Sequence, residues 1–109
     1  MLINQTVQGW LNAYDFETIT VSTSTKRLSS VKTEGNVPDD FGKARAAYIT
    51  SSTSAVRYRF DDDPTSTVGH VLPAGDLLTL TSYGEVNKVR FIRDDSEAVD
   101  AKLSVTFLR

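Results

Sequence analysis

Residues 57–70, RYRFDDDPTSTVGH, hold the densest group of side chains that could do chemistry in this chain. Carboxylates are ligands that Ca²⁺ prefers, and histidine is the commonest general base near neutral pH. The stretch is therefore a candidate metal site, a candidate catalytic loop, or a structured turn between strands. The stretch contains three aspartates, one proline, one glycine and the single histidine of the chain: Asp61, Asp62, Asp63, Pro64, Gly69 and His70.

The spacing of the three aspartates limits what they can bind. Consecutive residues of an extended chain point to opposite sides, so at most two of these carboxylates can converge on one ion. The spacing also differs from that of an EF-hand loop. Calcium binding by the cluster stays open, whereas a zinc site needs more nitrogen or sulfur ligands than one histidine and no cysteine can supply. The alternative is a turn closed by Pro64, with hydroxyls capping local backbone groups.

The sequence gives little support for catalysis. No G-x-S-x-G elbow accompanies His70, and no phosphate-binding glycine motif is present. We therefore expect no enzyme and no cofactor. We expect His70 to lie at the start of a strand, where it bonds a neighbouring backbone group or the aspartates.

The charge balance argues against nucleic acid and membrane partners. The chain has 109 residues, of which 12 are Lys or Arg and 14 are Asp or Glu, for a net charge of -2. That balance provides no field to attract a polyanion. No apolar run approaches the ~18 residues that a membrane helix needs. Arg57 and Arg59 alternate along one strand, and such arginines typically pair with acidic residues across strands.

The elements that must position these residues are strands. Residues 17–22, 55–60 and 101–108 alternate apolar and polar side chains, which is typical of half-buried strands. Turn residues such as those at 61–64, 73–76, 83–85 and 94–96 separate the runs. The sequence predicts an all-β fold, one antiparallel, jelly-roll-like β-sandwich of about seven or eight strands, with a barrel left open. Further candidate strands are 28–32, 44–50, 77–81 and 86–93.

The N-terminal part of the chain is less regular. Residues 17–109 are expected to form the sandwich domain, and residues 1–16 an arm or an irregular first strand. The arm is rich in apolar side chains, so we expect it to contact a partner; the alternative is that it belongs to the sandwich. The expected contact residues are Leu2, Ile3, Trp10, Leu11 and Phe16.

The second half of the chain resembles a family of small β-sandwich proteins encoded in tailed-phage genomes. In that family a strand ending R-Y-R meets an Asp/Gly turn and then P-T-x-x-x-G-H-x-L, followed by A-G-D and a strand. The pattern closes with F-I-R and a final L-x-V-T-(Y/F). The resemblance covers residues 46–109. Its matching pieces are Arg57-Tyr58-Arg59, Pro64-Thr65, Gly69-His70, Leu72, Ala74-Gly75-Asp76, Phe91-Ile92-Arg93 and residues 103–107.

The resemblance implies a β-sandwich located in the virion. It implies a capsid decoration, or cement, protein that binds the major capsid protein at the capsid surface as a homo-oligomer, expected to be a trimer. It also implies that residues 64–70 form a structured crossover between strands. Two other roles remain: a receptor- or carbohydrate-binding module of a tail or fibre, and a neck or tail-completion protein.

Overall fold

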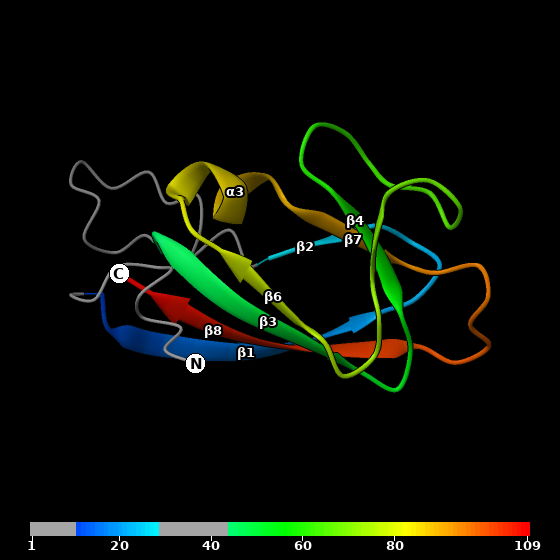
Figure 1. Cartoon of the computed structure of the whole chain (residues 1–109), viewed down its shortest axis with the longest axis horizontal. Helices are drawn as coiled ribbons and strands as arrows, with labels where there is room; N and C mark the ends of the chain where they lie inside the picture. Colours follow the sequence, from blue (N-terminus) through cyan, green and yellow to red (C-terminus); the bar gives the residue numbers. More distant parts are fainter. Residues whose placement is uncertain (1–10, 29–43) are drawn as a thin grey trace.

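A computed structural model describes residues 11–28 and 44–109, and within these ranges the chain forms two packed antiparallel sheets (Figure 1). This confirms the predicted antiparallel β-sandwich. The elements of the described ranges are β1 (Ala13–Val21), β2 (Lys26–Arg27), β3 (Ala46–Ser52), β4 (Val56–Arg59), β5 (His70–Leu72), β6 (Leu77–Leu80), α3 (Tyr83–Lys88), β7 (Arg90–Arg93) and β8 (Ala101–Leu108).

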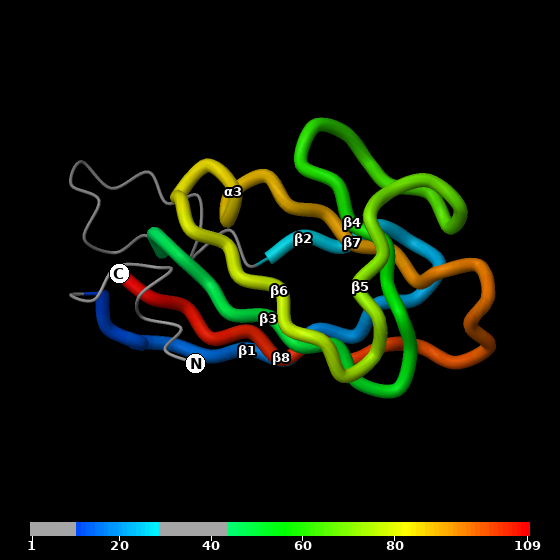
Figure 2. Tube along the Cα trace, in the orientation of Figure 1, coloured from blue at the N-terminus to red at the C-terminus, as the bar shows by residue number. Residues whose placement is uncertain are grey.

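The strands pair in a nested order. Sheet A has the order β1-β8-β3-β6, and sheet B has the order β2-β7-β4-β5. The antiparallel pair β4–β5 therefore lies inside β3–β6, which lies inside β2–β7 and then β1–β8. Figure 2 lets the reader follow the chain as it passes repeatedly from one sheet to the other. Strands β5 and β6 follow one another in the chain, and each is an edge strand of its own sheet.

The core lies between the sheets and uses alternate residues of each strand. Its largest fully buried side chains include Phe91, Phe107 and Ile49. On β4 the predicted face is confirmed, because Val56 is buried and Tyr58 packs against the same core. Burial of such side chains is the main term that holds a small domain together, at about 25 cal/mol per Å² of apolar surface.

The predicted strand over 86–93 is wrong in its first part. Residues 83–88 form the helix α3, and β7 begins only at Arg90. The Ser82 side chain accepts a hydrogen bond from the Glu85 amide, and Glu85 Oε1 accepts one from the Thr81 amide at 2.7 Å. These bonds cap the first turn of a helix, so the expected turn at 83–85 is where α3 begins.

Other boundaries differ from the predicted ones. Strand β1 starts at Ala13 and therefore includes the end of the expected arm. Lys26–Arg27, which lie outside the predicted strands, form β2 and pair with β7. Leu28 is buried, and the rest of the predicted strand 28–32 lies outside the described residues. His70 was predicted to begin a strand, and this is confirmed, because His70 is the first residue of the short strand β5.

Candidate functional site

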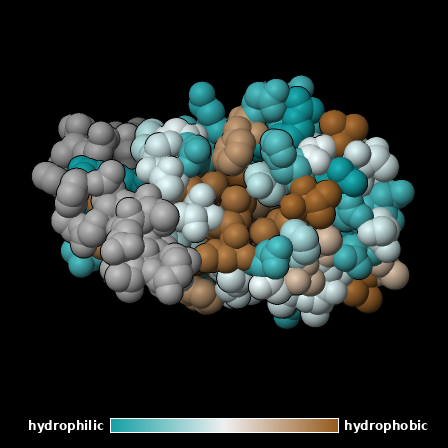
Figure 3. Space-filling model, viewed as in Figure 1, coloured by the Kyte–Doolittle hydropathy of each residue, from teal (hydrophilic) through white to brown (hydrophobic). Residues whose placement is uncertain are grey.

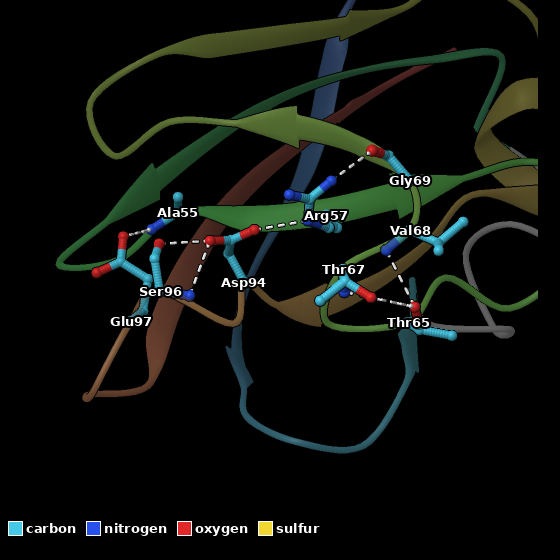
Figure 4. Close-up of polar contacts among 9 residues, drawn as sticks. All are labelled: Ala55, Arg57, Thr65, Thr67, Val68, Gly69, Asp94, Ser96 and Glu97. Carbon is cyan, nitrogen blue, oxygen red and sulfur yellow. Dashed lines mark hydrogen bonds and ion pairs between the residues drawn. The ribbon is translucent and has the colours of Figure 1, made fainter.

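Arg57 is the central anchor of the 57–70 stretch. Its Nε donates to Asp94 Oδ1 at 2.6 Å, and its Nη1 donates to the Gly69 carbonyl at 3.0 Å (Figure 4). The guanidinium thus connects β4, the start of β5 and the turn that follows β7. Both charged side chains are largely shielded from water, with exposed fractions of 24% and 9%. A planar, multidentate donor suits this junction better than a lysine would.

The turn after β7 is built around Asp94. Its Oδ2 accepts hydrogen bonds from the Ser96 amide, at 3.0 Å, and from the Ser96 hydroxyl. These bonds, more than the neighbouring Arg57, hold the pKa of Asp94 below its usual value, although burial acts in the opposite direction. One residue further on, Glu97 Oε2 accepts from the Ala55 amide at 2.6 Å. Asp94 is therefore a fully engaged carboxylate and a poor candidate for a general base.

The loop between β4 and β5 is held by contacts within itself and by one contact with the turn after β7. The Val68 amide donates to Thr65 Oγ1 at 3.0 Å, and the Asp95 amide donates to the Ser66 carbonyl at 2.9 Å. Gly69 has a φ of +140°, and a Cβ there would lie 3.1 Å from the Tyr58 carbonyl oxygen. The crossover therefore needs glycine at this position, both for its dihedral angle and for its space.

The three aspartates lie beside a row of arginines. Strand pairing places Arg27, Arg90 and Arg59 directly opposite one another on β2, β7 and β4. Like charges in such positions repel, so a row of three needs compensation. The two aspartates that follow Asp61 are closest to Arg90: Arg90 Nη1 lies 3.4 Å from Asp63 Oδ1 and 4.0 Å from Asp62 Oδ1.

Arg59 holds Asp61 with two parallel hydrogen bonds, at 3.0 and 2.9 Å. The bond from Arg59 is the main reason that the pKa of Asp61 is lowered. The predicted cross-strand pairing with an acidic residue is thus confirmed for Arg57, whose partner Asp94 follows β7, whereas Arg59 binds Asp61, two residues further along its own chain. In the ranges that the structure describes, no group of three or more His, Cys, Asp or Glu side chains is arranged to hold a metal ion.

His70 faces an aromatic neighbour. Its ring lies 5.3 Å from that of Tyr58, to which it is paired across β4 and β5. An open pocket nearby is lined by Arg59, Phe60, Asp61, Val68, Gly69 and His70. Its one ion pair, Arg59–Asp61, is internally satisfied, and none of its lining residues is an activated nucleophile. The pocket is open and can hold a small group.

The predicted partner-contact residues fall into different environments. Leu11 is 7% exposed and packs against Ala46, Leu108 and the half-buried Tyr48. Phe16, by contrast, is 56% exposed on β1. Leu2, Ile3 and Trp10 lie outside the described residues. Leu11 is therefore used within the fold, and the described contact candidate with a free side chain is Phe16.

The outer face of sheet A, on the side away from the core, was not predicted from the sequence. Strand register places three rows of outward side chains there: Phe16, Thr106, Tyr48 and Thr79; Thr18, Ser104, Thr50 and Leu77; Thr20, Lys102 and Ser52. A further row at one end, Leu108 and Ala46, is buried together with Leu11. Of these residues, Lys102 alone carries a charge. The alternation of hydroxyls along 17–22 and 101–108 was the available signal, but joining the rows requires the strand order.

Hydrophobic side chains also reach the surface where β5 and β6 run. Figure 3 shows them gathered near the middle of that view. Val71 on β5 is 46% exposed and Leu77 on β6 is 39% exposed. Leu77 belongs to the outer face of sheet A, so apolar groups lie at both edges of that face, with Phe16 on β1 at the other.

No protein-family model, curated protein or solved structure matches this chain. In the described ranges no helix has the length and apolar character needed to span a bilayer.

Proposed function

We propose that this chain is a structural protein of a phage virion, a capsid decoration protein that binds the major capsid protein on the head surface and stabilises the lattice. It acts without catalysis and as a homo-oligomer, for which the family resemblance implies a trimer. Weak contacts repeated over many copies would strengthen the lattice, because linked contacts gain from effective concentration.

The nested strand order supports a jelly-roll assignment for the sandwich. A long hairpin that folds over itself gives the pairs β1–β8, β2–β7, β3–β6 and β4–β5. Jelly rolls are used in viral capsid proteins, but also in lectins and cupins. The fold is therefore compatible with the proposal and does not by itself choose among these roles.

The observation that carries the proposal is the difference in charge between the two outer faces of the sandwich. On sheet B, Arg57 pairs with Asp94, and Arg59 and Arg90 pair with the aspartate cluster, so these candidate chemical residues are engaged in contacts within the fold. On sheet A, a broad and almost uncharged face remains. A domain with engaged charges on one side and a neutral sheet on the other suits attachment to another protein surface.

The test is the copy number of the protein in purified phage particles, measured by mass spectrometry against the major capsid protein. A ratio near one per capsid subunit is expected for a decoration protein. A handful of copies would instead assign the chain to the neck, tail or fibre. Absence from particles would overturn the virion assignment.

A second candidate is a receptor- or carbohydrate-binding module of a tail or fibre. The open pocket beside Phe60 and His70 favours it, since aromatic rings next to polar groups are common in ligand sites. Binding on a glycan array that is lost in His70→Ala, while thermal stability is kept, would favour this role over decoration.

A further inference from the structure

We propose that the free edge of β6 binds an extended segment of the major capsid protein, which adds to the four strands of sheet A as one further strand. This rests on the proposed function and deepens it, because it names the part of the chain that recognises the capsid protein. Strand addition is a common way to bind an extended peptide. Main-chain hydrogen bonds supply the affinity, and side chains on the two faces supply the specificity.

Three of the four edge strands in the described ranges carry features that oppose strand addition. Such features are short length, charge, proline, a bulge, or a charged side chain that points inward. Strand β1 has an irregular register near its start and carries Glu17 opposite the core residue Val105, on the inner side of the sheet. Strand β2 consists of two basic residues, and β5 has three residues and is followed by Pro73.

Strand β6 lacks these features. Its four residues, LLTL, include no charge and no proline, and they keep a regular register against β3. In the described ranges β6 pairs with β3 alone, so the backbone groups on its other side have no strand partner there. A row of alternating N–H and C=O groups is matched best by another extended main chain. The chemistry of the edge therefore selects a polypeptide segment as the ligand.

Apolar side chains lie on both sides of this edge. Leu77 is 39% exposed on the outer face of sheet A, and Leu78, on the inner side, is half-buried and packs against the core. Figure 3 shows the apolar surface where β6 runs. An added strand would cover both leucines, one with each of two successive side chains. We therefore expect an apolar residue on each face of the bound segment.

Charge favours a foreign segment over a second copy of β6. Asp76 is exposed and immediately precedes β6, where its amide donates to the Pro73 carbonyl at 3.1 Å. Opposite charges across neighbouring strands are stabilising. Residues 73–82 contain no Lys or Arg, so β6 of a second copy would bring no basic partner for Asp76. The expected segment is uncharged along β6 and has a Lys or Arg beyond it.

The experiment titrates the full, isotope-labelled chain with overlapping synthetic peptides that span the major capsid protein of the same phage. Residue-resolved hydrogen exchange reports the amides of Leu77–Leu80 and of β1. Peptides from one region of the capsid protein are expected to slow exchange of those β6 amides that do not bond to β3. Amides of β1 are expected to exchange as before. Docking of side chains alone would not give this pattern.

Lysine variants test whether the edge itself is used. Leu77→Lys and Thr79→Lys place a charge on the edge strand, and each is expected to weaken the Kd of the peptide at least about 10-fold. The matched controls are Thr50→Lys, directly opposite Leu77 on β3, and Val71→Lys on the edge strand β5 of sheet B. Both control positions are exposed, and both variants should bind like wild type. Circular dichroism with thermal melting reports folding of all four variants.

Four results would overturn the inference: no capsid peptide protects β6, the edge amides of β6 are already protected in the free chain, all four lysine variants weaken binding equally, or β6 pairs with a second copy. Particle composition is measured separately, so the two proposals can fail separately. A chain abundant in virions whose β6 binds no capsid peptide would refute strand addition alone. A chain absent from virions would refute the virion role, whatever the peptides do.

Discussion

Arg57 Nε and Asp94 Oδ1 lie 2.6 Å apart and join two segments separated by 37 positions in the sequence. The same guanidinium also binds the Gly69 carbonyl, so one side chain fixes the crossover loop to β4 and to the turn after β7. Since both partners are partly shielded from water, removing one leaves the other insufficiently compensated. Within the 57–70 stretch, loss of this junction is expected to lower the stability of the fold the most.

Acid should weaken the fold through Asp94. The folded-state pKa of Asp94 is lowered, so its contribution to stability is complete above the unfolded-state pKa of about 3.9 and is lost as pH falls through the folded value. Asp94→Asn should therefore be less stable at pH 7 and show a shallower decline below about pH 4. Denaturant unfolding across a pH series measures this, with Asp95→Asn as the control; equal acid slopes for Asp94→Asn and wild type would contradict it.

Gly69→Ala and Gly75→Ala should differ in cost. Both glycines have positive φ, but a Cβ at Gly69 would meet the Tyr58 carbonyl, whereas a Cβ at Gly75 has nothing within 4 Å. We expect a loss of about 3 kcal/mol for Gly69→Ala, from strain plus crowding, and about 1 kcal/mol for Gly75→Ala, from strain alone. Urea unfolding of the two variants checks the order; equal losses would show that the contacts at Gly69 relax freely.

Two phenylalanines allow a direct comparison of core and surface. Phe107 is fully buried in the core and Phe16 is 56% exposed. Phe107→Ala should lower the free energy of unfolding by about 3–5 kcal/mol, because it removes buried area and leaves a cavity. Phe16→Ala should change it by less than about 0.5 kcal/mol. A large loss for Phe16→Ala in monomeric protein would mean that the side chain packs within the fold.

The aspartate cluster should matter most at low salt. Changing Asp61, Asp62 and Asp63 together to Asn removes the counter-charges of Arg59 and Arg90 and leaves the arginine row uncompensated. Tm should fall relative to wild type in low-salt buffer, and the difference should shrink as salt screens the repulsion. A Tm difference that is unchanged by salt would contradict this, because it would mean that the loss comes from broken turn contacts and not from charge repulsion.

The strands were predictable where one face is buried and the other is polar. The alternation in 101–108 corresponds to β8 with the same bounds, because each inward residue packs in the core. The helix α3 carried a readable signal, a serine three positions before a glutamate, but the apolar residues Val86 and Val89 that follow also fit a strand. A two-residue strand such as β2 is too short for any period to register.

The site was less predictable, because its central contact joins residues that are distant in the sequence. Strand alternation predicts that Arg57 and Arg59 face away from the core, and residue types predict acidic partners. Arg59 binds Asp61 only two positions away, but the pairing of Arg57 with Asp94 depends on the register of β4 against β7, which no local pattern specifies. The same holds for the neutral face of sheet A, whose rows exist only once β1, β8, β3 and β6 are placed side by side.

The position of β8 has a consequence for how the protein is made. Within sheet A, β8 lies between β1 and β3 and pairs with both, although Ala101–Leu108 is the last strand of the fold to leave the ribosome. Strands β1 and β3 must therefore wait, unpaired with β8, while the intervening residues are synthesised at roughly 5–20 residues per second. Sheet A can therefore close only after residues 101–108 have been synthesised, and in the described residues a chain that stops before residue 101 lacks the strand that pairs with β1.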